Sequence, residues 1–234
     1  MQHSHPQSHS ENSVSEPGPS DAFDEEIDVE TADTTEPMRG RFYDSSDASR
    51  LQAGLASTLP IELEIGSGKG LFLARAAEQT PGHYFIGLEL ATKYARESQT
   101  RLEKRSVPNA CFVACDAVAV MHQDVSDSCL HAVHVYFPDP WWKSRHKKRR
   151  VLSDETILHI QRTLIPGGML HFWTDVLDYY EEAVARIGEL TQLQGPFYVP
   201  EPSAEHDMDY RTHFERRTRL NGLPVYRARF EKRS

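Results

Sequence analysis

The chain has 234 residues, 26 Lys and Arg against 35 Asp and Glu, a formal net charge of −9 and an apolar fraction of 38%. This length allows one large domain or two small ones, and the low apolar fraction predicts that part of the chain does not fold. No apolar stretch is long enough for a membrane span and no signal-type start is visible, so we expect no membrane association and a cytoplasmic location.

Residues 1–40 are predicted to form a disordered acidic tail. They hold ten acids against one base, Arg39, and almost no aromatic or branched apolar residues. Such a segment cannot bury enough surface to offset its chain entropy. The predicted folded domain, residues 41–234, then carries 25 acids and 25 bases, so the acidic total does not argue against a nucleic-acid partner.

From residue 61 onward, short apolar runs alternate with helical stretches. Strands are predicted at residues 61–65, 84–89, 111–115, 131–137, 169–173 and 224–230, and helices at 71–79, 93–105, 154–164 and 176–193. The breakers Pro166, Gly167 and Gly168 are expected to end the third helix. This alternation predicts an α/β fold with a doubly wound, mostly parallel sheet. Its ligands are expected beyond the carboxyl ends of the strands.

The glycines Gly66, Gly68 and Gly70 follow the first strand and allow a ligand to approach the backbone closely. A P-loop is not indicated, because Gly70 stands where Ser or Thr should follow Lys69. The dinucleotide fingerprint also fails, because the third glycine comes one residue too early.

Acids are predicted to follow four consecutive strands of the sheet: Glu89, Asp116, Asp139 and Asp175. Glu89 matches the acid expected on ribose hydroxyls, and Asp116 can accept from an adenine amino group. Together they suit a nucleoside cofactor without a pyrophosphate, of which S-adenosylmethionine is the common one. Glu64, in the first strand, is either a solvent-facing strand residue or a cofactor contact.

No metal site is expected from the cysteines. Cys111, Cys115 and Cys129 show no Cys-x-x-Cys spacing, which argues against a zinc knuckle and a disulfide scaffold.

Residues 137–150 read Phe-Pro-Asp-Pro-Trp-Trp-Lys-Ser-Arg-His-Lys-Lys-Arg-Arg. The two prolines predict an extended backbone at Phe137 and Asp139, so that the carboxylate points in a narrow range of directions. The cations that follow can neutralise several phosphates, although a solvated surface cluster is the alternative. Trp141 and Trp142 either stack on a base or the cofactor adenine, or pack in the core.

These motifs, with Thr212-His-Phe-Glu215, resemble the tRNA (guanine-N7)-methyltransferase family in its bacterial single-subunit form, from about residue 60 to the C-terminus. The resemblance implies a Rossmann-like class I methyltransferase fold. It further implies methyl transfer from S-adenosylmethionine to N7 of guanosine 46 in the tRNA variable loop, without an obligate protein partner.

The resemblance also implies roles for individual residues. Asp139 is expected to be catalytic. The expected cofactor-binding residues are Glu64, Gly66, Gly68, Glu89, Asp116 and Asp139. The expected substrate-binding residues are Lys143, Asp175, Thr212, His213, Phe214 and Glu215. The expected RNA-binding residues are Arg145, His146, Lys147, Lys148, Arg149 and Arg150.

Two rival functions fit the sequence less well than this one. A methyltransferase for a small molecule or protein would leave the run at residues 145–150 without a purpose. An inactive RNA-binding protein with the same fold would not need acids at four strand ends.

Overall fold

The computed structural model describes residues 44–142, 144–201, 203 and 210–233, and of Ser144, Lys147 and Lys148 it describes the backbone alone. The predicted tail, residues 1–40, and Lys143 lie outside the described residues.

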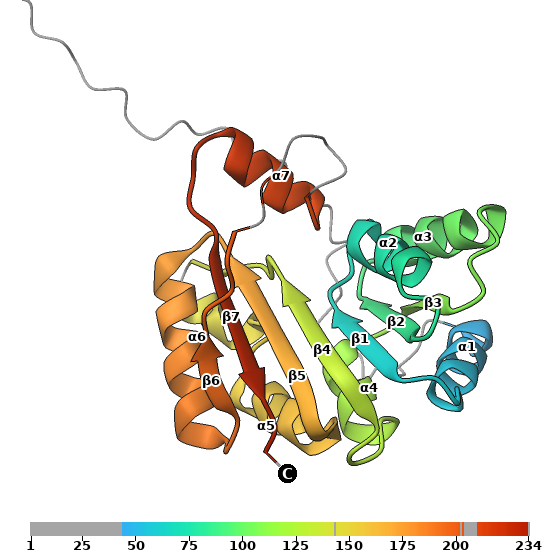
Figure 1. The fold of residues 1–234 in the computed structure, drawn as a ribbon, viewed down its shortest axis with the longest axis horizontal. Coiled ribbons are helices and arrows are strands. Elements are labelled where there is room, and N and C mark those ends of the chain that lie inside the picture. The colour runs from blue at the N-terminus through green and yellow to red at the C-terminus, as the bar shows by residue number, and fades with distance from the viewer. Residues whose placement is uncertain (1–43, 143, 202, 204–209, 234) are drawn as a thin grey trace, which may run out of the picture. The chain divides into compact units, whose positions relative to one another are not determined.

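The centre of the fold is a seven-stranded sheet in the order β3-β2-β1-β4-β5-β7-β6 (Figure 1). Strands β1 to β5 run parallel, and β7 is antiparallel to both β5 and β6. The strand order reverses between β1 and β4, which is the position where open α/β sheets form a crevice. The doubly wound, mostly parallel sheet predicted from the sequence is therefore confirmed. The strands are β1 (Ile61–Ile65), β2 (Tyr84–Glu89), β3 (Ala110–Ala114), β4 (Leu130–Tyr136), β5 (Leu164–Thr174), β6 (Gln194–Phe197) and β7 (Tyr226–Glu231).

Helices cover both faces of the sheet. The helices are α1 (Ser45–Leu55), α2 (Leu71–Gln79), α3 (Thr92–Lys104), α4 (Ala117–Gln123), α5 (Asp154–Thr163), α6 (Leu177–Leu190) and α7 (His213–Leu220), with a 3₁₀ helix, η1 (Ser144–Arg149). Apolar side chains of α1, α4, α5 and α6 join one core cluster, and those of α2 and α3 join a second. Helix α7 lies above the carboxyl ends of β4 and β5 in the view of Figure 1.

Four of these helices begin at a side-chain cap. The N-cap residues Asp44, Asp116, Ser153 and Thr212 accept hydrogen bonds from backbone N–H groups in the first turns of α1, α4, α5 and α7. Such caps satisfy donors that the helix itself leaves unpaired. In the part of the chain that the structure describes, no helix has the length and apolarity that crossing a bilayer requires.

The largest difference from the predicted strand boundaries is the start of β5, at Leu164 and not at residue 169. Pro166, Gly167 and Gly168 were expected to end a helix, yet that helix ends at Thr163 and the three residues lie inside β5. Gly167 N donates to the carbonyl of Lys232 (2.7 Å), and Lys232 N donates to the carbonyl of Gly168 (2.9 Å). Backbone pairing with the chain end beyond β7 thus keeps these breakers in the sheet.

Two glycines of the loop differ in the space around them, so an added side chain should have a different effect at each. Gly70 has φ of +69°, and a Cβ there would lie 2.4 Å from Cζ of Phe112, whereas Gly68 (φ +52°) would face open space. Gly70→Ala combines overpacking with left-handed strain, so we expect it to lower the free energy of unfolding by about 2 to 4 kcal/mol. Gly68→Ala should cost only the strain, about 1 kcal/mol. Urea denaturation of both variants checks this, and equal losses would contradict the packing argument.

Candidate active site at the carboxyl edge of the sheet

The glycine loop leaves an open cradle after β1. Gly66, Gly68 and Gly70 all have positive φ, and a Cβ at Gly66 or Gly68 would have no atom within 4 Å. Ser67 Oγ is buried beside them, and no hydrogen-bond partner is found for it among the described residues. The loop therefore combines free space with an available polar atom, as a ligand-binding loop requires.

Glu89, at the end of β2, ties this loop to the next one. Its Oε2 accepts from Gly68 N (2.7 Å) and its Oε1 from Ala91 N (2.8 Å). Burial raises the pKa of Glu89, and the nearby charge of Asp139 raises it further, against the lowering effect of the backbone hydrogen bonds. The structure thus brings Glu89 and Asp139, expected at successive strand ends, into one electrostatic environment.

Glu64 faces the interior of the protein and not solvent. Its side chain lies in β1 with only 3% of the residue exposed, which excludes the solvent-facing alternative. No hydrogen-bond partner is found for its Oε2 within the described ranges. Burial, followed by the charge of Glu89, raises the pKa of Glu64 well above its ordinary value. A buried carboxyl with an unused oxygen is a site that a ligand donor can complete.

Asp116 and Asp175 lie where the strand pattern predicted them, after β3 and β5. Asp116 is exposed, and its Oδ1 accepts from Val118 N (3.0 Å) and Ala119 N (3.3 Å) as the cap of α4. Asp175 is also exposed, and its Oδ2 accepts from Thr218 Oγ1 of α7 (3.4 Å). Asp116 therefore lies on the β3 side of the crevice, and Asp175 lies against α7.

The turn around Asp139 is strained. Phe137 and Trp141 have φ of +49° and +45°, a region that costs of order 1–3 kcal/mol for a residue with a side chain. The predicted extended backbone at Phe137 is therefore wrong. Pro138 disfavours only the right-handed helical region at Phe137. Tertiary contacts decide the conformation, because Phe137 N donates to the carbonyl of Trp173 (2.8 Å) and the Phe137 ring stacks with Phe214 at 6.3 Å.

Asp139 is presented at the rim of the crevice. Its side chain reaches solvent, yet the surrounding protein desolvates it enough to raise its pKa. The strained turn constrains this carboxylate, and its charge contributes to the raised pKa of Glu89, so a constrained group occupies the position expected for a catalytic acid.

Trp141 supports the basic run that follows. The Arg149 guanidinium lies 5.2 Å from the Trp141 ring centroid, and the His146 ring meets Trp141 edge-on at 5.8 Å. Arg145 and Arg149 are exposed on η1, and Trp142 is 69% exposed. Trp141 is therefore engaged by the run itself, whereas Trp142 presents its ring to solvent.

Arg150 differs from the rest of the run because it is 7% exposed. Its Nε donates to the carbonyl of Pro140 (2.7 Å), its Nη1 donates to Glu182 (2.8 Å), and its guanidinium lies 4.4 Å from the Tyr179 ring centroid. These contacts join the Asp139 turn to α6. We therefore leave Arg150 out of the candidate RNA surface.

The Thr212–Glu215 segment contains a helix cap and a buried anchor. Thr212 Oγ1 accepts from Glu215 N (3.0 Å), and Glu215 Oε2 accepts from Arg211 N (2.6 Å). Glu215 is 0% exposed, and its Oε1 accepts from Arg227 (3.1 Å) and Arg219 (3.4 Å). These two residues hold α7 in place by a variant of the capping box. His213 and Phe214, between them, are exposed toward the crevice side.

A buried hydrogen-bond chain, which the sequence did not indicate, reaches this segment from the core. Arg211 Nη1 donates to the Tyr136 hydroxyl (3.0 Å), which in turn contacts Nδ1 of His134 (2.9 Å). Nε2 of His134 lies 2.7 Å from Glu62 Oε2, and Nδ1 of His83 lies 2.6 Å from Glu62 Oε1. A guanidinium can only donate and a carboxylate can only accept, so the direction of donation is fixed from Arg211 to Glu62.

The charges of this chain agree with that direction. Burial raises the pKa of Glu62, but the hydrogen bond and charge of His134, and then those of His83, lower it to about 2. Burial lowers the pKa of His134, more than its bond to Glu62 raises it. At neutral pH, Glu62 is therefore ionised and His134 is neutral with its proton on Nε2, so His134 stabilises the carboxylate there by its hydrogen bond and not by charge. The chain fixes Arg211, which is the residue that precedes the N-cap Thr212 of α7.

The chain is similar to known methyltransferases in its sequence and in its fold. A family model described as a putative methyltransferase matches residues 58–228. The tRNA (guanine-N(7)-)-methyltransferase of Rhodopirellula baltica is 49% identical over 181 residues, which cover 75% of this chain and 67% of that protein. The enzyme of the same name from Myxococcus xanthus is 32% identical over 201 residues, covering 84% and 95%. Among solved structures, the 16S rRNA methyltransferase KamB has a TM-score of 0.57 at 16% identity, covering 83% and 96%, a likeness of fold alone.

The hydrogen-bond chain that ends at Glu62 should make the stability of the folded protein depend on pH in the acid range. The folded-state pKa of Glu62 is about 2, below its ordinary 4.5, so its stabilisation is complete above about pH 4.5 and is lost as the pH falls toward 2. Glu62→Gln should flatten this acid limb and lower the free energy of unfolding at pH 7 by about 1 to 3 kcal/mol. Urea unfolding at several pH values tests this, with the exposed Glu181→Gln as a control. An unchanged acid limb in Glu62→Gln would contradict the assignment.

Proposed function

Because the chain belongs to the tRNA (guanine-N7)-methyltransferase family, we propose that it methylates N7 of guanosine 46 in the variable loop of tRNA, with S-adenosylmethionine as the methyl donor. The family gives the reaction, the tRNA substrate and the cofactor. The position of the target nucleotide is our own proposal. The observation that supports the reaction best is the carboxylate of Asp139, which a strained turn constrains directly before the basic run.

The residues at the crevice fit S-adenosylmethionine. Glu89 can accept from the ribose hydroxyls, because each of its oxygens retains a lone pair beyond its backbone bond. Asp116 can accept from the adenine amino group through Oδ2. The unused Oε2 of Glu64 suits the cofactor's ammonium group. The open space at Gly66 and Gly68 lets the cofactor approach the backbone of the loop closely. When bound, the cofactor supplies an electrophilic methyl group on a sulfonium.

The charge of the crevice favours a cationic ligand. Burial and then the charge of Glu89 raise the pKa of Glu64, and burial and the charge of Asp139 raise the pKa of Glu89. A positively charged ligand offsets this repulsion and favours the ionised carboxylates. The same argument disfavours a phosphate-rich nucleotide as the cofactor.

The target base needs alignment more than deprotonation, because guanine N7 carries a free lone pair at neutral pH. Holding N7 in line with the methyl group can contribute roughly 7 to 11 kcal/mol in favourable cases. Asp139 is placed to accept from the guanine N1–H edge and to stabilise the positive charge that the ring gains. Glu215, another residue expected at the base, is fully buried, so we assign the edge contact to Asp139 or Asp175.

Exposed aromatic rings at the rim can hold the target base. Phe214 stacks with Phe137 at 6.3 Å and keeps about half of its surface exposed, and Trp142 is more exposed still. Unpaired bases stack on such rings, and this contact is tolerant of base identity. We propose that Phe214 and Trp142 receive the extruded guanine, while Asp139 distinguishes it by its edge.

The proposed tRNA surface consists of the exposed part of η1 and the outer side of α7. Arg145 and Arg149 are exposed on η1, and Arg217 is exposed on α7 with its guanidinium 5.1 Å from the Phe214 ring centroid. Arg219, by contrast, pairs with Glu215 and Glu201 and supports α7 from within. Two basic segments therefore flank the rim where Asp139 lies.

The proposal is tested by incubating the full chain with labelled S-adenosylmethionine and unmodified tRNA, followed by nucleoside analysis. We expect N7-methylguanosine, and none from a transcript in which guanosine 46 is replaced by adenosine. Label at another guanosine would refute the position but not the reaction. Label in another base, in protein or in neither would refute the proposed function.

In the same assay, Asp139→Asn removes the negative charge but keeps the shape of the side chain. We expect kcat to fall by about 100-fold or more, because the charge on the methylated ring loses its stabilisation. Cofactor affinity, measured by calorimetry, should change far less. The control is Asp127→Asn, an exposed residue in the loop before β4, which should retain full activity. Unchanged kcat in Asp139→Asn would exclude this role.

The two arginines at the end of the basic run should behave differently. Arg149→Ala should weaken tRNA binding and reduce the slope of log K against log salt by about 0.7 to 0.9 for one lost phosphate contact. Arg150→Ala should leave that slope unchanged and lower the free energy of unfolding by about 1 to 3 kcal/mol, because the Pro140 carbonyl loses its buried donor and Glu182 its partner. Binding measured at several salt concentrations, with urea unfolding of both variants, separates the two roles. A change in salt slope for Arg150→Ala would contradict its structural assignment.

A further inference from the structure

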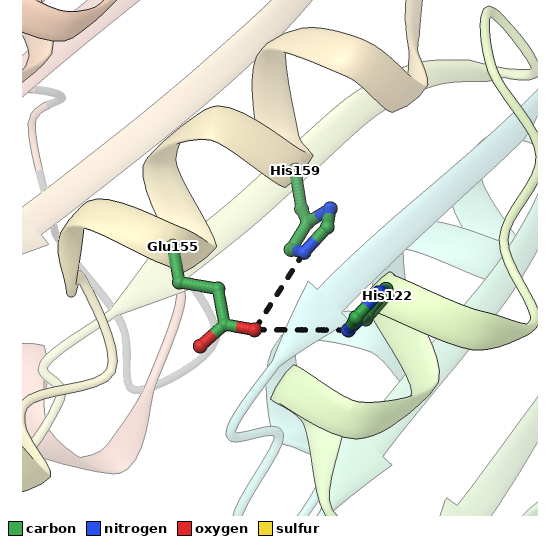
Figure 2. A group of neighbouring side chains, drawn as sticks. All are labelled: His122, Glu155 and His159. Atoms are coloured by element: carbon green, nitrogen blue, oxygen red, sulfur yellow. Dashed lines mark ion pairs between the residues drawn. The ribbon is translucent and has the colours of Figure 1, made fainter.

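Two helices on one face of the sheet bring together three metal-ligating side chains far from the glycine loop in sequence. His122 lies near the end of α4, and Glu155 and His159 lie one turn apart on α5 (Figure 2). Figure 2 shows one oxygen of the Glu155 carboxylate facing both imidazole rings, with an ion pair drawn to each. Residues at positions i and i+4 of a helix share one face, so α5 presents its two groups together toward α4.

The distances between the ligand atoms are close to those of a metal site. Glu155 Oε1 lies 3.7 Å from His122 Nδ1 and 3.9 Å from His159 Nε2, and all three atoms lie within 4.8 Å of one another. In a tetrahedral zinc site with bonds of 2.0 to 2.2 Å, two ligand atoms are about 3.4 Å apart. Small side-chain rotations that bring the three ligand atoms closer together would therefore allow them to bind one ion.

We propose that His122, Glu155 and His159 form a binding site for one zinc ion. Two imidazole nitrogens and a carboxylate oxygen are a ligand set that zinc accepts, with water in the fourth position. Hard cations such as Mg²⁺ prefer oxygen ligands and are disfavoured by the two imidazoles. An ion bound to these three side chains would cross-link α4 and α5.

One ligand is held in place and two are free to adjust. The His159 side chain is 16% exposed, whereas those of His122 and Glu155 are 59% exposed. The two imidazole rings stack at 4.9 Å, so His122 must rotate to direct its lone pair at a shared ion, and its exposure permits this. Most of the adjustment therefore occurs in solvent-exposed side chains at little cost.

The neighbouring Arg162 does not prevent binding. Its Nε lies 3.4 Å from His159 Nδ1, at the long end of the hydrogen-bond range, and its other nitrogens donate to Asp127 and to the Met121 carbonyl. Asp127 compensates its charge. Arg162 Nε donates to Nδ1, so zinc binding at Nε2 requires the proton to move to Nδ1 and this one long hydrogen bond to be given up, while Arg162 keeps its bonds to Asp127 and the Met121 carbonyl.

The site would connect two segments that border the crevice. Helix α4 begins at the cap residue Asp116, and α5 begins five residues after η1 ends at Arg149. An ion that joins these helices restrains both of them on the face of the sheet opposite α2 and α3. Its role is structural, and no step of methyl transfer depends on it.

The test is zinc titration of the full chain, treated first with a chelator, in a background in which the tail residues His3, His5 and His9 are changed to Ala. This background removes competing imidazoles that lie outside the described residues. Calorimetry should show one zinc ion per chain, and Co²⁺ should give the visible absorption bands of a low-coordinate site. His122→Ala and His159→Ala should each weaken zinc binding by about tenfold or more.

Matched variants separate the site from general surface binding. Glu155→Gln should weaken zinc binding, whereas Glu181→Gln, an exposed glutamate on α6, should not. His122→Gln keeps a polar side chain and provides a second variant, with circular dichroism confirming that each protein is folded. The absence of stoichiometric zinc binding by the background protein would overturn the proposal. So would folded His122 and His159 variants that bind zinc as tightly as the background protein does.

Discussion

The parallel pairing of β1 with β4 is the constraint on which the site depends. This is the point where the strand order reverses, and the register places Glu64 opposite His134. Because the strands are parallel, the loops that leave them emerge at the same edge of the sheet. The glycine loop after β1 and the Asp139 turn after β4 therefore share one crevice, although about 70 residues separate them in sequence. Without this pairing, neither the carboxylate cluster nor the buried chain from Arg211 to Glu62 could form.

Buried ions hold the segments that we assign to RNA and substrate. Arg150 links the Asp139 turn to α6, and Glu215 links α7 to β7 through Arg227. Each charge has several partners, which is the condition under which a buried ion can be tolerated. Residues that look like surface cations or substrate contacts in the sequence thus act as anchors, and their exposed neighbours Arg149 and Phe214 are left to contact ligands.

The long alternating elements could be predicted from sequence, because apolar spacing reports burial directly. Helix α4 has seven residues and η1 and α7 are mostly charged, so none of them shows an apolar period that could be recognised. The acids at strand ends were predictable from topology, and the charge of Asp139 contributes, after burial, to the raised pKa of Glu89. The conformation of Phe137 was not, because contacts with Trp173 and Phe214 override the preference set by the proline. The partners Glu62 and His134 lie on different strands, and no local pattern relates them.

The carboxylates around the glycine loop also affect how the enzyme completes a cycle. Methyl transfer converts the sulfonium of the donor into a neutral thioether, so the spent cofactor carries one positive charge less than the fresh one. Burial and then the charge of Glu89 raise the pKa of Glu64, and once the sulfonium charge is lost the ligand offsets less of this repulsion. With the cofactor contacts that we propose for Glu64 and Glu89, the crevice should hold the product less firmly than the donor, so the groups that attract the fresh cofactor also favour release of the spent one.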